Sequence, residues 1–429
     1  MERKRSVLAA RVSEPGLHGT IAAIWRIESP RLIAQLLRVT RDVGRAEDLA
    51  QDAFVAALAQ WPDEGIPRSP GAWLATSAKR RAIDQLRRDK TMALKTELLG
   101  RDLPAGGTEA DFAQSFEEID DDVLRLMFVA CHPVLSPDAR VALTLKLLGG
   151  LTTAEIARAY LTSEATIAQR IVRAKRALTD ANVTLEVPSG AERARRVASI
   201  LEAVYLIFNE GYAASSGDAV LRPELVEDAL RLGRMLAALL TNEREVHGLV
   251  ALMEIQASRM PARLGPDGAP ILLLDQDRGK WNHLLIRRGL DALDRAQRLG
   301  DLGPYGVQAA IAACHARARK AEETDWRAIA ELYGALARIV PSPVVELNRA
   351  VAVGMADGPA AGLAVVDTLT AEPALARYHL LPSVRGDLLF KLGRFPEARA
   401  EFERALTLAH NTRDKDFLRK RAAECEAEV

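Results

Sequence analysis

The chain has 429 residues, of which 48% are hydrophobic and 5% aromatic, and its 58 basic and 58 acidic side chains give a formal net charge of zero. A chain of this length is expected to form roughly two to four domains, and none of its apolar runs approaches the roughly 18 residues that a membrane-spanning helix needs. Ala, Leu and Arg dominate while alternating Val, Ile and Thr runs are almost absent, which predicts an all-α protein.

Residues 19–60 are expected to form two or three helices. The segment 44–61 is amphipathic, because apolar and polar side chains recur on opposite sides at helical spacing. Its apolar side carries Leu49, Phe54 and Leu58, and its polar side carries Glu47, Asp48, Gln51 and Asp52. The next eleven residues, 61–71, contain three prolines and two glycines, and this composition predicts a loop.

A second amphipathic and strongly basic helix is predicted over residues 72–90. Six Lys or Arg and two Asp lie between Lys79 and Lys90. Ile83 and Leu86 share one face, and the other carries Arg81, Gln85 and Arg88, with Trp73 at the start. Aromatic residues beside arginines suit unstacked bases and phosphates, although a Trp73 in the core beside solvated arginines explains the pattern equally well. Seven acids without a base follow at 109–122, which predicts a linker over about 100–121.

Residues 151–178 have the pattern of a helix-turn-helix. Thr152 and Glu155 fit a capping box, and Ser163 fits the cap of a second helix. The face predicted to point inward consists of Ile167, Ile171, Ala174 and Leu178. The opposite face carries Thr166, Gln169, Arg173 and Arg176, with Arg170 at its flank and Lys175 near the apolar edge. Arg and Gln can reach base edges and phosphates, so double-stranded DNA is the favoured ligand over a merely solvated surface helix.

A break at 187–190 precedes a C-terminal region that is expected to be helical throughout, with loops at 213–222, 261–282, 300–305 and 341–343. Near its end, residues 379–410 match one tetratricopeptide (TPR) repeat, and 348–369 match a poorer copy. The small and aromatic residues of the better repeat are Gly386, Gly393, Phe395, Ala398, Phe402 and Ala405. Because one repeat cannot bury its own face, the preceding helices are expected to stack on it.

Signals for an enzyme are weak. The polar residues Glu210, Asp275, Asp277, Arg278, Lys280 and His283 more often form salt bridges between stacked helices than a metal or catalytic site. The three cysteines lack Cys-x-x-Cys spacing, which argues against a disulfide framework or a zinc site and fits a reducing cytoplasm. A phosphate-binding GxxxxGK[ST] loop is absent. We therefore expect no catalytic residue, no metal and no cofactor.

The order of these motifs resembles the extracytoplasmic-function (ECF, group IV) sigma factors of bacterial RNA polymerase. The resemblance covers residues about 20–182 and rests on DVGRAEDLAQDAFVAAL, the proline-rich loop, AKRRAIDQLRR, the acidic linker and LTTAEIARAYLTSEATIAQRIVRAKRAL, in that order. It implies two small helical sigma domains followed by a helical array. The implied boundaries are 1–95 for region 2, 96–121 for the linker, 122–185 for region 4 and 190–429 for a TPR-like regulatory domain.

The resemblance also implies roles for individual residues. Docking on the clamp helices of core RNA polymerase is assigned to Asp48, Gln51 and Asp52. Binding of the promoter −10 element is assigned to Trp73, Arg80, Arg81, Gln85 and Arg88, with the loop 61–71 capturing a flipped base. Reading of the −35 element is assigned to Thr166, Gln169, Arg170, Arg173 and Arg176. Arg80 departs from the family pattern, because many relatives have Asn at this position.

The C-terminal half resembles a subset of these sigma factors that carries a TPR-like extension, through the segments FNEGY (208–212), LLLDQDRGKWN (272–282) and GPYGVQAAIAACHA (303–316). In that subset the extension is thought to regulate activity, and small DGPF/YCII-like proteins accompany it. The resemblance thus implies a cytoplasmic sigma factor that binds promoter DNA and not a membrane. The alternative is a helix-turn-helix regulator with a protein-binding module that never engages polymerase, for which the acidic helix at 44–60 would have no use.

Overall fold

The computed structural model describes residues 14–97, 119–183, 185–212, 221–266, 268, 271–409 and 412–427, without the side chains of 14–16, 85–97, 119–121 and 412–413. Across these ranges the protein consists of helices and contains no strand, which confirms the all-α prediction. The chain divides into two compact units, Met1–Leu239 and Leu240–Val429. The predicted linker falls almost entirely outside the described residues.

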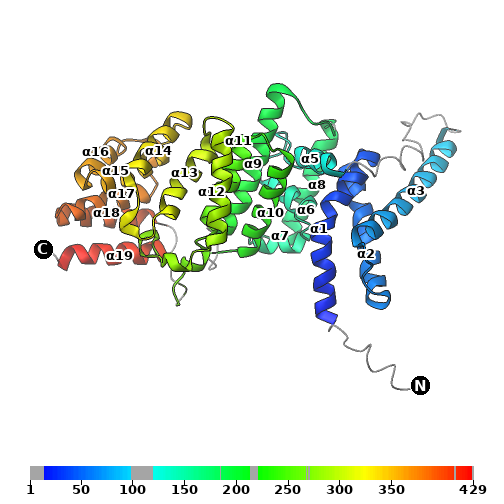
Figure 1. The fold of residues 1–429 in the computed structure, drawn as a ribbon, viewed down its shortest axis with the longest axis horizontal. Coiled ribbons are helices and arrows are strands. Elements are labelled where there is room, and N and C mark those ends of the chain that lie inside the picture. The colour runs from blue at the N-terminus through cyan, green and yellow to red at the C-terminus, as the bar shows by residue number, and fades with distance from the viewer. Residues whose placement is uncertain are drawn as a thin grey trace, which may run out of the picture. The chain divides into compact units, whose positions relative to one another are not determined.

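The first unit contains nine described α-helices (Figure 1). They are α1 Glu14–Thr40, α2 Val43–Glu64, α3 Pro70–Glu97, α5 Ile119–Ala130, α6 Pro137–Leu147, α7 Thr153–Ala159, α8 Glu164–Asp180, α9 Gly190–Tyr212 and α10 Pro223–Leu239. Helix α1 packs against α2, α3 and α5, while α9 packs against α10, α6 and α5. Two helices beyond residue 190 therefore belong to the same compact unit as the helix-turn-helix.

The predicted loop at 61–71 is shorter than expected, and the prediction was wrong at both of its ends. Helix α2 continues through Pro62 to Glu64, and α3 begins at Pro70. Trp61 is 2% exposed, and its carbonyl oxygen accepts a hydrogen bond from the N–H of Gly65, which fixes the last turn of α2. Proline at the start of a helix costs nothing, because the first N–H groups have no partner within the helix.

The second unit is an array of helices in which neighbours along the chain pack on one another. Its α-helices are α11 Arg244–Ala257, α12 His283–Arg298, α13 Pro304–Arg317, α14 Trp326–Ile339, α15 Pro343–Ala356, α16 Pro359–Thr368, α17 Leu380–Lys391, α18 Phe395–Leu408 and α19 Thr412–Ala427. Short 3-10 helices lie at Met260–Ala262, Leu273–Asp275, Arg278–Lys280, Ala321–Glu323 and Pro373–Leu375. The pairing of successive helices is the TPR-like arrangement that the sequence predicts.

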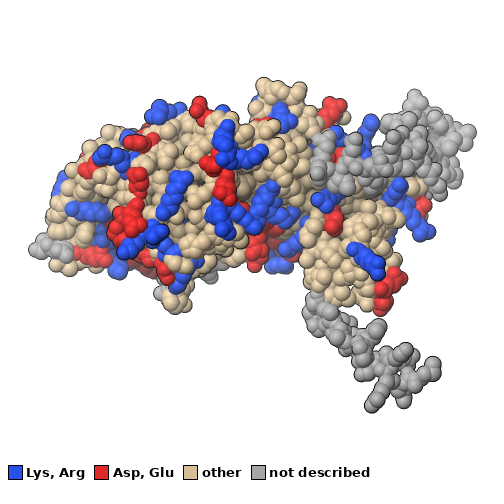
Figure 2. Space-filling view, in the orientation of Figure 1, with Lys and Arg blue, Asp and Glu red and all other residues tan. Residues whose placement is uncertain are grey.

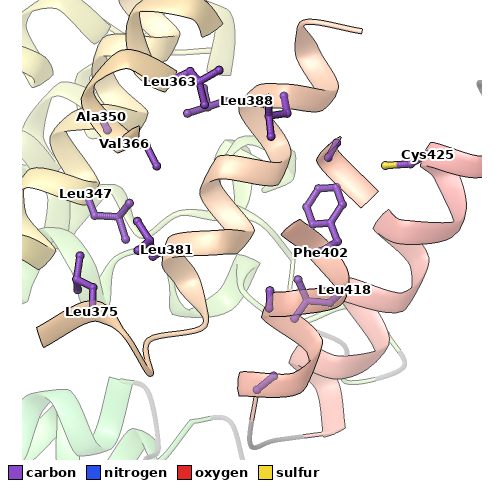
Figure 3. Close-up of a cluster of buried hydrophobic side chains, with 14 residues drawn as sticks. Leu347, Ala350, Leu363, Val366, Leu375, Leu381, Leu388, Phe402, Leu418 and Cys425 are labelled. Atoms are coloured by element: carbon purple, nitrogen blue, oxygen red, sulfur yellow. The ribbon is translucent and has the colours of Figure 1, made fainter. Parts of the chain in front are cut away.

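The predicted repeat is the helix pair α17–α18, whose side chains point into a shared core with α15, α16 and α19 (Figure 3). A Cβ at Gly386 would lie 2.9 Å from the ring of Phe402, so the two helices approach as closely as glycine permits. Phe402 is 1% exposed and Leu418 of α19 is 2% exposed. The helices of the neighbouring pair α15–α16 also pack closely at glycine, because a Cβ at Gly362 would lie 2.8 Å from the Cα of Gly354.

Candidate nucleic-acid interface

The caps predicted for the helix-turn-helix are confirmed. The hydroxyl of Thr152 accepts a hydrogen bond from the N–H of Glu155 at 3.1 Å, and the carboxylate of Glu155 accepts one from the N–H of Thr152 at 2.7 Å. Ser163 caps α8 by accepting from the N–H of Thr166 at 3.1 Å. Burial favours the neutral form of Glu155, but the Thr152 hydrogen bonds and the ion pair with Arg26 outweigh it, so its pKa is lowered.

The turn between α7 and α8 is a Schellman motif. The N–H of Thr162 donates to the carbonyl of Ala157 at 3.0 Å, and the N–H of Leu161 donates to that of Arg158 at 3.3 Å. Leu161 has a φ of 46°, in the left-handed region that glycine usually fills at this point of the motif. The hydrogen bonds and a strained, non-glycine residue together define the direction in which α8 leaves the turn.

Helix α8 has the two faces that the sequence predicts. Ile167, Ile171, Ala174 and Leu178 are all buried, at most 5% exposed. Gln169 and Arg173 are exposed, and the part of the structure that is described gives Arg173 no acidic partner. Thr166 and Arg176 are exposed too, but the Thr166 hydroxyl is hydrogen-bonded to that of Ser163 at 2.7 Å, and Arg176 lies 3.5 Å from Asp180.

The remaining two cations of α8 are held by carboxylates. Arg170 is half-buried and lies 3.2 Å from Asp138 of α6. Lys175 forms an ion pair with Glu47 of α2, and Lys146 of α6 lies 3.5 Å from the same carboxylate. Fewer basic residues of α8 are therefore free to contact a ligand than the sequence alone indicates.

Glu47 does not lie on the polar side of α2, contrary to the prediction. Its side chain is 5% exposed because it is enclosed between the two lysines, which come from positions more than 90 residues further along the chain. Asp48 and Asp52 are exposed, as predicted. Gln51 is half-buried and donates its side-chain N–H to Glu47 at 2.5 Å.

The structure describes the side chains of only some of the site residues predicted on helix α3. Trp73 is half-buried and packs edge-on against Trp61, with ring centroids 5.3 Å apart. Arg80 is exposed and Arg81 is half-buried. Gln85 and Arg88 lie within α3, but their side chains are outside the described residues.

One exposed residue of α8 was missed by considering only polar side chains. Val172 is 64% exposed, although it lies among the polar residues of the outward face. On the side of the molecule shown in Figure 2, basic and acidic side chains are interspersed over the surface. That side of the molecule therefore presents no single sign of charge.

Helices α9 and α10 are joined to the helix-turn-helix by hydrogen bonds of two arginines. Arg140 of α6 donates to the hydroxyl of Ser199 at 2.7 Å and to the carboxylate of Glu202 at 2.6 Å. Arg231 of α10 donates to the carbonyl oxygens of Leu148 and Gly149, at 3.1 and 3.3 Å, in the segment that leads from α6 to α7. The guanidinium groups thus bind the start of the C-terminal region to α6 and its following turn.

The polar constellation considered for an enzyme has structural partners. Arg278 donates to the carbonyl oxygens of His315 and Ala318, at 2.7 and 2.8 Å, and Asp277 accepts from the N–H of Gly279 at 2.9 Å. Glu210 pairs with Arg222. In the described ranges, metal-ligating side chains form no group of three or more, and no helix there has the length and apolarity to cross a membrane.

Three family models match the chain. Residues 24–91 match "Sigma-70 region 2", residues 125–178 match "Sigma-70, region 4", and residues 196–297 match "Family of unknown function (DUF6596)". The third match starts within α9 and ends within α12. The first sigma match contains α2, and the second contains α8 as far as Leu178.

Relatives fall into two kinds. An "Uncharacterized protein" of Rhizobium meliloti (strain 1021) is 42% identical over 400 residues, covering 93% of this chain and 94% of that protein. The "ECF RNA polymerase sigma factor SigK" of Mycobacterium ulcerans (strain Agy99) is 32% identical over 152 residues, covering 34% of this chain and 78% of that protein. Among solved structures, yeast Tom70 superposes with a TM-score of 0.37 at 10% identity, covering 96% of this chain and 86% of that one, too loosely to carry an argument.

Proposed function

Because this chain belongs to the ECF RNA polymerase sigma factors and acts in transcription initiation, we propose that its two N-terminal domains divide polymerase and promoter binding between them. Residues 1–95 bind core polymerase and the −10 element, and residues 122–185 read the −35 element, with 96–121 as the linker. Core polymerase, and not this chain, makes the phosphodiester bonds. The site of action is the cytoplasm. The observation that carries the proposal is the outward face of α8, where Gln169 and Arg173 are exposed.

The −35 assignment rests on which basic residues of α8 are paired with carboxylates and which polar residues are exposed. Arg170 and Lys175 are bound to Asp138 and Glu47, so they position the helix within the unit. Gln169 and Arg173 are exposed and lie about 40° apart on the helix at 3.6 residues per turn. An α-helix fits the major groove, where Arg recognises guanine and Gln recognises adenine by paired hydrogen bonds. For the −10 element, Trp73, Arg80, Arg81, Gln85 and Arg88 of α3 are the proposed contacts.

The polymerase assignment rests on Asp48 and Asp52, two exposed carboxylates one turn apart on α2, with Gln51 between them. We expect Asp48→Ala with Asp52→Ala to weaken binding to core polymerase about thirtyfold or more, because charge pairs at an interface each contribute about 1 kcal/mol or more. The matched control is Asp63→Ala with Glu64→Ala, which removes two exposed acids from the end of the same helix. The affinity of each double variant for fluorescently labelled core polymerase is measured. Equal losses in the two double variants would point to general charge and not to docking at Asp48 and Asp52.

Promoter binding requires α2 and α8 to separate. The −35 and −10 elements lie about 25 base pairs apart, roughly 85 Å along B-DNA at about 3.4 Å per base pair. The Lys175–Glu47 and Arg26–Glu155 ion pairs join the two domains directly. A chain bound to both elements has to break these pairs, so we propose that this paired arrangement precedes promoter engagement.

We propose that the C-terminal domain, residues 190–429, controls this opening. The support is that α9 and α10 hold α6 and the following turn through Arg140 and Arg231. The partner that acts on this domain would bind the helical array beyond Leu240. A small DGPF/YCII-like protein is a candidate for that partner.

Run-off transcription tests this function. Core polymerase, the full chain and a chain ending at Leu239 are compared on the DNA upstream of the chain's own gene. We expect a discrete transcript that requires the added protein, and a different yield from the two forms. A chain that binds that DNA but neither binds core polymerase nor yields a transcript would instead be a helix-turn-helix regulator. Equal yields from both forms would count against control by residues 240–429.

A further inference from the structure

Val172 is the largest apolar side chain on the exposed face of α8. It is 64% exposed, more than any other large hydrophobic residue reported for the described parts of the chain. Scattered apolar residues are common on protein surfaces, so exposure by itself assigns no role. The position of Val172 on the helix does.

At about 100° per residue, Gln169 and Arg176 lie within about 60° of Val172 and on the same side of it. The buried residues Ile167, Ile171, Ala174 and Leu178 occupy the opposite side. Ala168 and Ala165, also exposed, flank Val172 one and two turns toward the start of α8 and are too small to cover it. Any surface that Gln169 contacts is therefore also in reach of Val172.

The chemistry of the major groove explains an apolar residue at this place. Every base-pair edge there offers hydrogen-bond donors or acceptors, and only thymine adds a methyl group. A valine in contact with that methyl removes both apolar surfaces from water, whereas opposite any other base it leaves polar edge atoms beside an apolar surface. β-Branching also limits Val172 to few rotamers in a helix, so little freedom is lost on contact.

We propose that Val172 contacts the 5-methyl group of a thymine in the −35 element and so contributes to promoter specificity. This inference rests on the proposed function of α8 as the −35 reader. It adds an apolar contact to the polar ones assigned to Gln169 and Arg173.

The test uses uracil, which is thymine without the methyl group. Promoter duplexes bound by holoenzyme are prepared with each −35 thymine replaced by uracil in turn. At one position we expect the wild-type holoenzyme to bind the uracil duplex about three- to fivefold more weakly, the effect of one buried methyl group. With Val172→Ala, binding to the thymine duplex falls by a similar factor and the preference for thymine disappears. Val172→Thr, which keeps one methyl, retains part of the preference.

Val344→Ala is the matched control, because Val344 is a 37% exposed valine on α15, which carries none of the residues proposed to bind polymerase or promoter. Its ratio of thymine to uracil affinity should equal that of the wild type. A wild-type ratio of one at every −35 thymine, or an unchanged ratio in Val172→Ala, would overturn the inference while leaving the −35 assignment intact. Holoenzyme that binds no −35 sequence at all would overturn the proposed function and this inference with it.

Discussion

A chain ending at Ser189 is expected to lose most of the stability of its helix-turn-helix, whereas a chain ending at Leu239 is expected to keep it. The shorter chain lacks α9 and α10. Helix α9 packs on α5 and α6 and buries Ile200, Val204 and Phe208 to 2% exposure or less. Each such side chain contributes about 1.5–3 kcal/mol when fully buried, so the combined loss is comparable to the total stability of a small domain, about 5–15 kcal/mol.

Loss of α9 also removes two partners of the Arg140 guanidinium, the Ser199 hydroxyl and the Glu202 carboxylate. Thermal unfolding followed by circular dichroism compares the two truncated chains with the full chain. We expect a drop of more than about 10 °C in the first transition of the chain ending at Ser189 and little change for the chain ending at Leu239. A helix-turn-helix that melts at the same temperature in all three would show that α9 and α10 are peripheral to its stability.

Replacement of Arg173 by alanine is expected to weaken −35 binding by about 1–3 kcal/mol, or roughly five- to 150-fold, if its guanidinium reads a base. Arg173 is exposed, and no carboxylate holds it away from the DNA in the described parts of the chain. The measurement is a titration of −35 duplexes with holoenzyme at several salt concentrations. A base contact changes the preference at one position, whereas a phosphate contact weakens all sequences alike and lowers the salt slope by about one.

The matched control is Arg195→Ala, which removes an arginine that is 74% exposed from α9 of the same unit. We expect it to leave −35 affinity within about twofold, since Arg195 is already ion-paired with Glu192 and an exposed charge has little effect once screened by salt. Equal losses for Arg173→Ala and Arg195→Ala would mean that the effect is one of overall charge. No loss for Arg173→Ala would remove Arg173 from the site.

The elements that depend on local sequence were predictable. The buried face of α8 follows from apolar residues at helical spacing, and the caps at Thr152 and Ser163 follow from side chains that satisfy backbone groups within three residues. The close packing of α17 on α18 follows from Gly386, which opposes Phe402. In these places, partner atoms lie within one or two turns or in the adjacent helix.

The features that the sequence did not predict depend on distant partners. Glu47 is buried because Lys146 and Lys175 enclose it, and neither lysine is near it in the chain. Helix α2 continues through Pro62, and the adjacent Trp61 is buried against Trp73, which lies twelve residues further along the chain. The sequence pattern does not single out Val172, because an apolar residue at one position of a polar helix face carries no hydrogen-bonding signal. Helical periodicity specifies a face of each helix but not what covers it.

The ion pair between Glu47 and Lys175 affects how strongly this chain binds DNA outside its promoters. While Glu47 neutralises Lys175, α8 presents one cation fewer to a phosphate backbone, and each cation that contacts phosphate adds about one to the salt dependence of sequence-independent binding. The closed chain should therefore bind random DNA more weakly than its separated helix-turn-helix would. Separation exposes the Glu47 carboxylate beside Asp48 and frees the Lys175 ammonium on α8, so the affinity for random DNA is expected to rise when the two helices part.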